Sequence, residues 1–401
     1  MDFHKAVDEF ENHASADSMD RIVGFARSAN LDDENIAYLA LSLARSGSML
    51  KWREGGSRAD IASTGGPSSL STILCPLFLR QMEVQVPKLG VPGRPAGGID
   101  VLAQIPGYRV HFDESEVCQI LDRCGYVHFL AEGRFAPRDG QLYTYRKQHD
   151  AVNLPELAIA SLLSKKIAVG ITKAGLDVRV APHGNLGTTW AEAKRNAVRF
   201  NRVAKLVGIE AVCILTDARL PYQPFIGRGE ALIAMDELLA GKADAWLTQH
   251  YRQCFAMAKV VSGVDSSLPS ASEILPAFQS NLEAQGASVE AFNAAVSAVR
   301  RKRRFEMLAA GEGFLTIDLE CLRETLVRTQ IDFQTEDTPF PDTSGVILAS
   351  RTGDYVTKRE LLATVRCEET KWPEIEPVLR SAFVLSESPG RLAGFEEVVD
   401  A

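Results

Sequence analysis

The 401-residue sequence lacks several features that mark common classes of protein. It has no run of 18 apolar residues, so we expect neither a membrane-spanning helix nor a membrane partner. The N-terminal residues are polar, and no apolar segment follows that would suit a secretory signal. The seven cysteines are scattered without a Cys-x-x-Cys pair, which is typical of reduced thiols and predicts a cytoplasmic location.

Familiar catalytic and cofactor motifs are missing as well. The chain has no HExxH, GxSxG, GxGxxG or Walker A motif. These absences argue against a zinc hydrolase, a serine hydrolase and a dinucleotide-binding dehydrogenase, and we expect no metal site. The net charge of −8 does not favour a nucleic-acid partner, and the basic run at 300–304 fits a solvated helix face better than a nucleic-acid patch.

What is present is an ordinary globular composition, 46% hydrophobic and 24% charged, in a chain long enough for two or three domains. Helical spacing dominates the first 53 residues, where Asp32 or Asp33 could cap a helix, and alternating strands and helices then indicate an α/β fold. Further expectations are a buried helix at 70–79, a helical segment at 138–170 capped by Asn153, strands at 178–181 and 212–215, helical segments at 229–262 and 270–310, and short strands within 345–366.

Two glycine-rich loops could hold an anion, although either could equally be a simple turn. Backbone N–H groups crowd a phosphate only where Cβ atoms do not obstruct them. The second loop carries Lys88 and Arg94. The first loop combines hydroxyls and glycines, at Ser63, Thr64, Gly65, Gly66 and Ser71.

Arg146, Ser161 and Lys165 form another candidate cluster. Ser161 and Lys165 are four residues apart, so they share one face of a helix. Two cationic donors and a hydroxyl suit a ligand with two carbonyl oxygens, such as a uracil ring. Positive charge would also stabilise the anion that such a ring becomes when it leaves a sugar. A lysine at a helix end is, however, usually only solvated.

In this order, the loop and the cluster resemble the thymidine phosphorylase and pyrimidine nucleoside phosphorylase family, which is related in fold to anthranilate phosphoribosyltransferase. The family's Lys-His-Ser-Thr-Gly-Gly is similar to Ile-Ala-Ser-Thr-Gly-Gly at 61–66, and its Arg, Ser and Lys keep the spacing of Arg146, Ser161 and Lys165. Further similar segments are 97–102, 105–107, 177–180 and 215–217, with weaker matches near the C-terminus.

The resemblance implies a mainly helical small lobe and a larger α/β lobe with a central mixed sheet, with the active site in a cleft between them. It also implies domain closure and a homodimer formed through the helical lobe. We expect the helical lobe at 1–56 and 138–168, the α/β lobe at 57–137 and 169–330, and a C-terminal α+β subdomain at 331–401.

The implied reaction is reversible phosphorolysis of a pyrimidine nucleoside, with phosphate as co-substrate and no cofactor. Arg146 and Lys165 would bind the base carbonyls and stabilise the leaving base, while Ser161 would bond the ring N–H. Two alternatives stay open. One is a pentosyl or phosphoribosyl transferase that uses a different anion, such as a phosphosugar or a diphosphate donor, and the other is a non-catalytic pyrimidine-binding homologue.

The phosphate half of the implied site departs from the family. Ala62 replaces the family's catalytic His, and Ile61 replaces the phosphate-binding Lys before it. Lys88 and Arg94 could compensate for the lost lysine, and His183 could replace the imidazole from across the cleft. The alternative is that all three are ordinary loop or turn residues.

Overall fold

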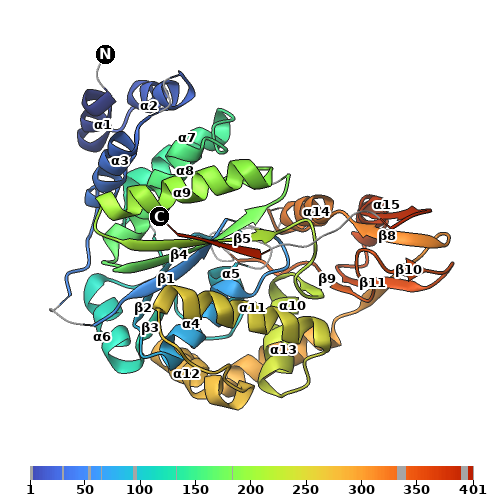
Figure 1. The fold of residues 1–401 in the computed structure, drawn as a ribbon. Helices are drawn as coiled ribbons and strands as arrows, with labels where there is room; N and C mark the ends of the chain where they lie inside the picture. The colour runs from blue at the N-terminus through green and yellow to red at the C-terminus, as the bar shows by residue number, and fades with distance from the viewer. Residues whose placement is uncertain are drawn as a thin grey trace.

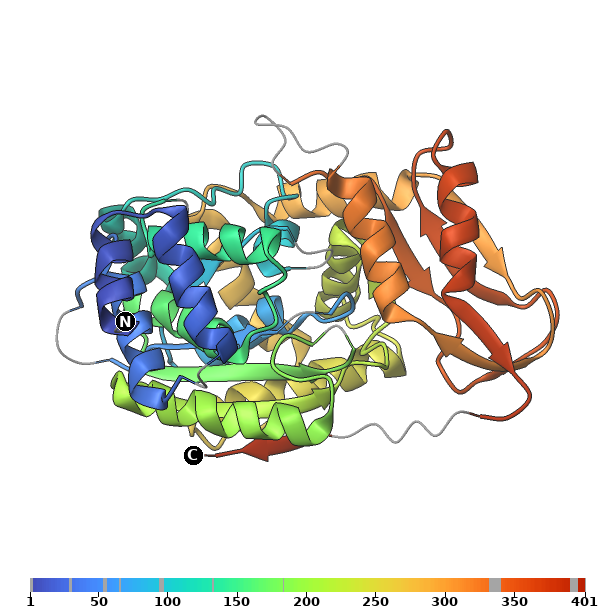
Figure 2. The same cartoon turned by 90° about the horizontal axis from the view of Figure 1, so that it is seen from above.

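The chain is represented by a computed structural model, and Figures 1 and 2 show its fold. The residues that the structure describes are 3–28, 31–52, 56–64, 66–93, 97–131, 133–182, 184–331, 340–389 and 396–400. Gly65, Arg94 and His183 lie outside these ranges.

The helical lobe joins helices from the N-terminus with helices from the middle of the chain. Helix α3 packs on α8, and α1 packs on α2. Asp32 caps α3 by accepting a hydrogen bond from Asn35 N at 2.8 Å, which confirms that prediction. The expected cap at Asn153 is wrong, because Leu154 precedes α8 and Pro155 opens it without needing a partner for an N–H. The helices are α1 (Phe3–Asn12), α2 (Ala16–Ser28), α3 (Asp33–Arg45), α7 (Pro137–Gln148) and α8 (Pro155–Ala168).

A mixed sheet lies at the centre of the molecule, in the order β1-β4-β5-β13. The first three strands are parallel, and β13 pairs antiparallel with β5. Helix α9 lies on one face of the sheet, and α4 and α11 lie on the other (Figure 1). The bounds are β1 (Ala59–Ser63), β4 (Lys173–Val180), β5 (Glu210–Asp217), β13 (Glu396–Val399), α4 (Ser71–Gln81), α9 (Trp190–Leu206) and α11 (Ala245–Ser262).

Beside this sheet, β2 and β3 form a parallel pair that α6 covers. Helix α4, expected as a buried helix, buries its side chains against this part of the molecule and against α11 and α12. The elements are β2 (Val86–Gly90), β3 (Tyr126–Leu130), α5 (Gly98–Leu102), α6 (Glu114–Cys124), α10 (Arg228–Leu239), α12 (Ala271–Ala284) and α13 (Val289–Arg301).

The C-terminal region stands at one end of the molecule (Figure 2) and has its own apolar core. Its two sheets have the orders β6-β9-β11-β7 and β10-β8-β12. Glu230 on α10 binds this region to the rest, because its carboxylate accepts from Arg366 Nε at 2.8 Å and from Arg304 Nη2 at 2.9 Å. The elements are β6 (Phe225–Ile226), β7 (Arg304–Leu308), β8 (Gly313–Ile317), α14 (Leu319–Ile331), β9 (Gly345–Leu348), β10 (Tyr355–Val356), β11 (Leu361–Arg366), α15 (Trp372–Ser381) and β12 (Phe383–Ser386).

The predicted fold class, a helical lobe with a larger α/β lobe around a mixed sheet, is confirmed. The helical segments expected at 229–262 and 270–310 are confirmed in part, because each contains two helices. The first breaks before Asp244, which caps α11, and the second breaks at Ser288 and gives way to β7. The domain boundaries stay a prediction. Among the described residues, every helix is too short or too polar to span a bilayer.

Candidate functional site

Ser161 and Lys165 lie together on α8, as their spacing predicts. Lys165 Nζ donates to Ser161 Oγ at 3.0 Å and to Asp139 Oδ2 at 2.5 Å. Asp139 belongs to the first turn of α7, which Pro137 opens. The side chains of Lys165 and Asp139 are only 11% and 9% exposed, so this is a largely buried ion pair. Among the described residues, these two contacts engage two of the three N–H groups of the ammonium, and its role in binding a base stays a prediction.

Arg146 has a different environment from the other two members of the cluster. Its guanidinium donates to three main-chain carbonyls, those of Ala151 at 3.0 Å, Val152 at 2.6 Å and Leu157 at 3.2 Å. Burial lowers the pKa of Arg146, although the nearby Asp139 carboxylate raises it. Three of its five N–H groups thus hold the turn between α7 and α8, and its role in binding a base stays a prediction.

The Ser-Thr-Gly-Gly loop leaves the carboxyl end of β1 and leads into α4. Thr64 is buried, and its Oγ1 accepts from the main-chain N of Arg179 at 2.9 Å. Ser69 Oγ accepts from the N–H of Ser71 and donates to its Oγ, both at 3.0 Å. Ser63 is half-buried at the end of β1. The predicted hydroxyls therefore do gather at one loop, next to the strand that carries Arg179.

Asp177 and Arg179, two residues apart on β4, form a buried ion pair beside this loop. Asp177 Oδ2 accepts from Arg179 Nε at 2.9 Å, from its Nη2 at 2.6 Å, and from Ser71 Oγ at 3.2 Å. The other oxygen, Oδ1, accepts from Thr216 at 3.0 Å. Burial alone would lower the pKa of Arg179, but Asp177 raises it, so the guanidinium stays charged.

Within the described part of the chain, no residue accepts a hydrogen bond from the second terminal nitrogen of Arg179, Nη1, although this nitrogen is buried. It lies against Gly66, where a Cβ would come within 2.8 Å of it. Gly66 has φ +107°, a conformation that residues with a Cβ rarely adopt.

Tyr222 and His250 close the other side of this pair. The Arg179 guanidinium lies 4.8 Å from the centre of the Tyr222 ring, and the His250 ring stacks on Tyr222 at 5.5 Å. His250 Nε2 accepts the N–H of Leu70, at the start of α4. Burial, together with the charge of Arg179, lowers the pKa of His250 to about 4, so the imidazole is neutral at pH 7.

Lys88 lies on β2 and is engaged inside the α/β lobe. Its Nζ donates to Asp60 Oδ1 at 2.5 Å and to the carbonyl of Ile61 at 2.7 Å. Lys166 of α8 pairs with the other oxygen of Asp60. Although burial opposes it, the two lysines hold the pKa of Asp60 well below its usual range. One N–H of Lys88 remains, and its part in phosphate binding stays a prediction, as do those of the undescribed Gly65, Arg94 and His183.

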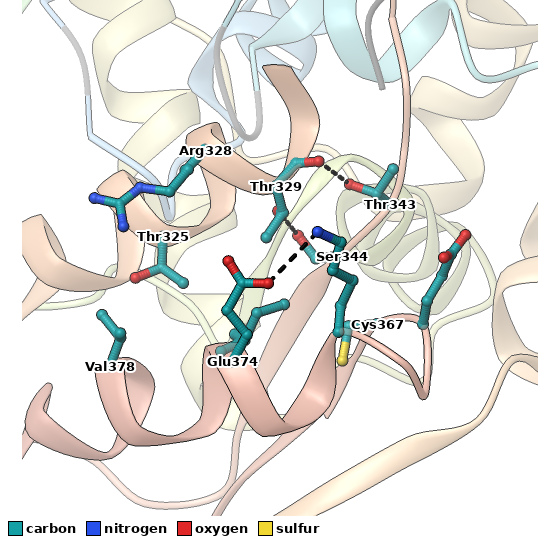
Figure 3. A pocket seen from close by; sticks show the side chains of 11 residues that line it. Thr325, Arg328, Thr329, Thr343, Ser344, Cys367, Glu374 and Val378 are labelled. Atoms are coloured by element: carbon teal, nitrogen blue, oxygen red, sulfur yellow. Dashed lines mark hydrogen bonds and ion pairs between the residues drawn. The ribbon is translucent and has the colours of Figure 1, made fainter. Parts of the chain in front are cut away.

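A hollow between α14 and α15 contains none of the predicted site residues (Figure 3). Its hydroxyls bond within the wall, since Thr329 Oγ1 and Ser344 Oγ are 2.5 Å apart and Thr343 donates to the Thr329 carbonyl. Burial raises the pKa of Cys367 in this wall to about 11, so its thiol is protonated near neutral pH. The predicted site residues that the structure describes lie elsewhere, on α7, α8, β2 and the loop after β1, and their roles stay predictions.

The sequence missed Asp139, the orientation of Arg179, and the Tyr222–His250 stack. Asp139 comes from another helix, and its distance along the chain gives no sign of the contact. Arg179 was weakly indicated by the sequence. Residues two apart on a strand lie on the same face, so Asp177 and Arg179 place opposite charges side by side near the end of a buried strand. Among the described residues, no three His, Cys, Asp or Glu side chains form a group that could hold a metal, and the expectation of no metal or cofactor stays a prediction.

Comparison with known proteins gives distant matches that cover most of the chain. A pyrimidine-nucleoside phosphorylase of Staphylococcus haemolyticus is 24% identical over 358 residues, which are 84% of this chain and 81% of that protein. One from Staphylococcus aureus is 23% identical over 375 residues, covering 89% and 86%. No model of a protein family matches the chain. The chain is therefore distantly similar to pyrimidine-nucleoside phosphorylases over most of its length.

Among solved structures, anthranilate phosphoribosyltransferase from Saccharomyces cerevisiae has a similar fold. It superposes with a TM-score of 0.51 and 14% sequence identity, over 74% of this chain and 91% of that chain. At this identity the likeness concerns the fold alone. It agrees with the two-lobed α/β architecture predicted from the sequence.

Proposed function

We propose that the chain is a pentosyltransferase that cleaves or forms the N-glycosidic bond of a uracil- or thymine-type nucleoside, with phosphate as the other substrate. The observation that carries the proposal is the ammonium of Lys165, which Asp139 and Ser161 hold in a fixed place on α8. The names of the relatives, which match over more than four fifths of the chain, support the same reaction class.

Lys165 would act on the departing base. In phosphorolysis, a phosphate oxygen forms a bond to the anomeric carbon, and the bond from that carbon to the ring nitrogen breaks. The bonding pair leaves with the base, whose negative charge spreads to its carbonyl oxygens. A fixed ammonium beside such an oxygen binds this anion more strongly than the neutral nucleoside, which lowers the barrier.

Ser161 would select the ring edge. Its Oγ already accepts from Lys165 and has a second lone pair, which can accept the ring N–H next to the carbonyl. A donor and an acceptor side by side match the carbonyl and N–H of a uracil or thymine edge. Cytosine has no ring N–H at this place, so we expect cytidine to be a poor substrate.

Substrate tests with the full chain would check the proposal. We expect free base from uridine or thymidine only when phosphate is present, detected by chromatography. The Lys165→Met variant should lose this activity, whereas Met at the exposed Lys205 should not. Base release with a diphosphate sugar donor but not with phosphate would favour the alternative transferase. Nucleoside binding that depends on Lys165, with no base release from any donor, would favour a non-catalytic pyrimidine-binding protein. A homodimer through the helical lobe remains part of the proposal.

A further inference from the structure

The guanidinium of Arg179 has more N–H groups than the described residues around it accept. Its Nε and Nη2 bond to Asp177, and Nη2 also reaches Ser71 Oγ at 3.3 Å. Nη1 is buried, and none of the residues that the structure describes accepts a hydrogen bond from it. A charged donor that is buried without an acceptor costs far more than an ordinary hydrogen bond contributes, so folded proteins rarely keep one without a purpose. An acceptor from outside the chain, such as a phosphate oxygen, would complete the arrangement.

The position of Nη1 shows where that acceptor belongs. The nitrogen faces Gly66, in the loop between β1 and α4. The Cβ of any other residue there would come within 2.8 Å of Nη1 and crowd it, so a glycine at this position keeps the nitrogen clear of side-chain atoms of residue 66. The hydroxyls of Ser69 and Ser71 lie in the same loop, where α4 begins. The N-terminal end of a helix carries a partial positive charge, which adds to the attraction for an anion.

Asp177 fixes the orientation of the guanidinium, and it does so without accepting a hydrogen bond from Nη1. Its Oδ2 takes two N–H groups on one side of Arg179, and its Oδ1 is directed to Thr216. The Tyr222 ring supports the flat face of the guanidinium. These contacts fix the plane of Arg179, so Nη1 is presented to the loop in one direction and little order is lost when a ligand binds.

We propose that Arg179 is the cation that binds a phosphate group at the loop of residues 63–71, in place of the charge that Ile61 and Ala62 do not supply. The ligand class is a phosphate group, either inorganic phosphate or the phosphate of a pentose phosphate. This inference rests on the proposed function for its reaction partner, but binding of the anion can be measured without any nucleoside.

A test uses titration calorimetry of the full chain with inorganic phosphate, a pentose 1-phosphate and inorganic diphosphate in separate experiments. Arg179→Lys keeps a positive charge next to Asp177 and removes Nη1. We expect it to weaken binding of the preferred anion by about 10-fold or more, the effect of one lost charged hydrogen bond. The anion that binds most tightly to the unaltered chain shows which source of phosphate the site takes.

Arg366→Lys is the matched control, because Arg366 is equally buried and is also paired with carboxylates, but in the C-terminal region. It should leave anion binding unchanged. A double variant, Asp177→Asn with Arg179→Gln, removes both charges of the pair and should also lose the anion while remaining folded by circular dichroism.

The inference is overturned if none of the three anions binds the unaltered chain, if Arg179→Lys binds them as well as the unaltered chain does, or if Arg366→Lys weakens binding equally. These outcomes separate it from the proposed function. Anion binding that depends on Arg179 without base release leaves the inference standing and removes the phosphorylase. If Arg179→Lys releases base with an unchanged KM for phosphate, the phosphorylase stands and the inference about Arg179 falls.

Discussion

Replacing Lys165 by methionine should affect stability and base binding together, and a second change should separate the two effects. Methionine keeps most of the volume of the side chain but leaves Asp139 without its cation. Because the pair is only 9% and 11% exposed, solvent screens it little. Breaking a buried pair in this way costs about 3 kcal/mol of unfolding free energy, at the lower end of the usual range. Loss of a charged hydrogen bond to the base adds a separate loss of about 10- to 150-fold in kcat/KM.

The double variant Asp139→Asn with Lys165→Met distinguishes these effects. Neutral asparagine needs no cation, so urea unfolding should return most of the lost stability. Phosphorolysis of uridine, followed by release of uracil, should stay as low as in Lys165→Met. If the double variant regained both stability and activity, Lys165 would only serve to neutralise Asp139, and the reasoning that assigns it to the base would be refuted.

Three further outcomes follow from the structure. Glu230→Gln should lower the unfolding free energy by about 3 kcal/mol in urea titration, because Arg304 would lose its pair with Glu230 and Arg366 would keep only its pair with Asp342. The pKa of His250 lies at about 4 in the folded chain, below its ordinary value near 6.5, so unfolding takes up a proton between these pH values. Stability should therefore fall as the pH drops through this window, and His250→Gln should flatten that slope in unfolding curves measured from pH 7 to pH 4. Gly66→Ala should weaken binding of phosphate by at least 10-fold in calorimetry, since its Cβ would crowd Arg179 Nη1.

The local features of the fold could be predicted because short-range rules decide them. Four-residue spacing placed Ser161 and Lys165 together, and an aspartate before a helical pattern located the start of α3. The helical segment expected at 229–262 contains two helices, because Asp244 caps α11 and starts a second helix there. The same kind of signal was available there, since Gly241 is typical of the end of one helix and Asp244 of the start of the next.

The partners of the site residues could not be predicted, because they depend on tertiary contacts. Nothing in the sequence indicates that Arg146 spends its N–H groups on nearby carbonyls, or that Asp139 meets Lys165 from another helix. Lys88 was expected to bind phosphate, yet it forms an ion pair with Asp60 on the neighbouring strand β1. The sequence identifies the cationic side chains, but the packing decides which of their N–H groups bond within the protein and which could bond to a ligand.

The final strand gives the C-terminal region two attachments to the same lobe. This region leaves the lobe after α13, and β13 returns to lie along β5, where Asn201 Nδ2 donates to the carbonyl of Val399 at 2.8 Å. A part of the chain that is tethered at both ends cannot swing out like a terminal module on a single linker. Deleting residues 396–401 would free one tether and leave β5 with an open row of backbone groups, a surface prone to pairing with another molecule. We therefore expect such a truncated chain to aggregate in light scattering well before its helical content changes.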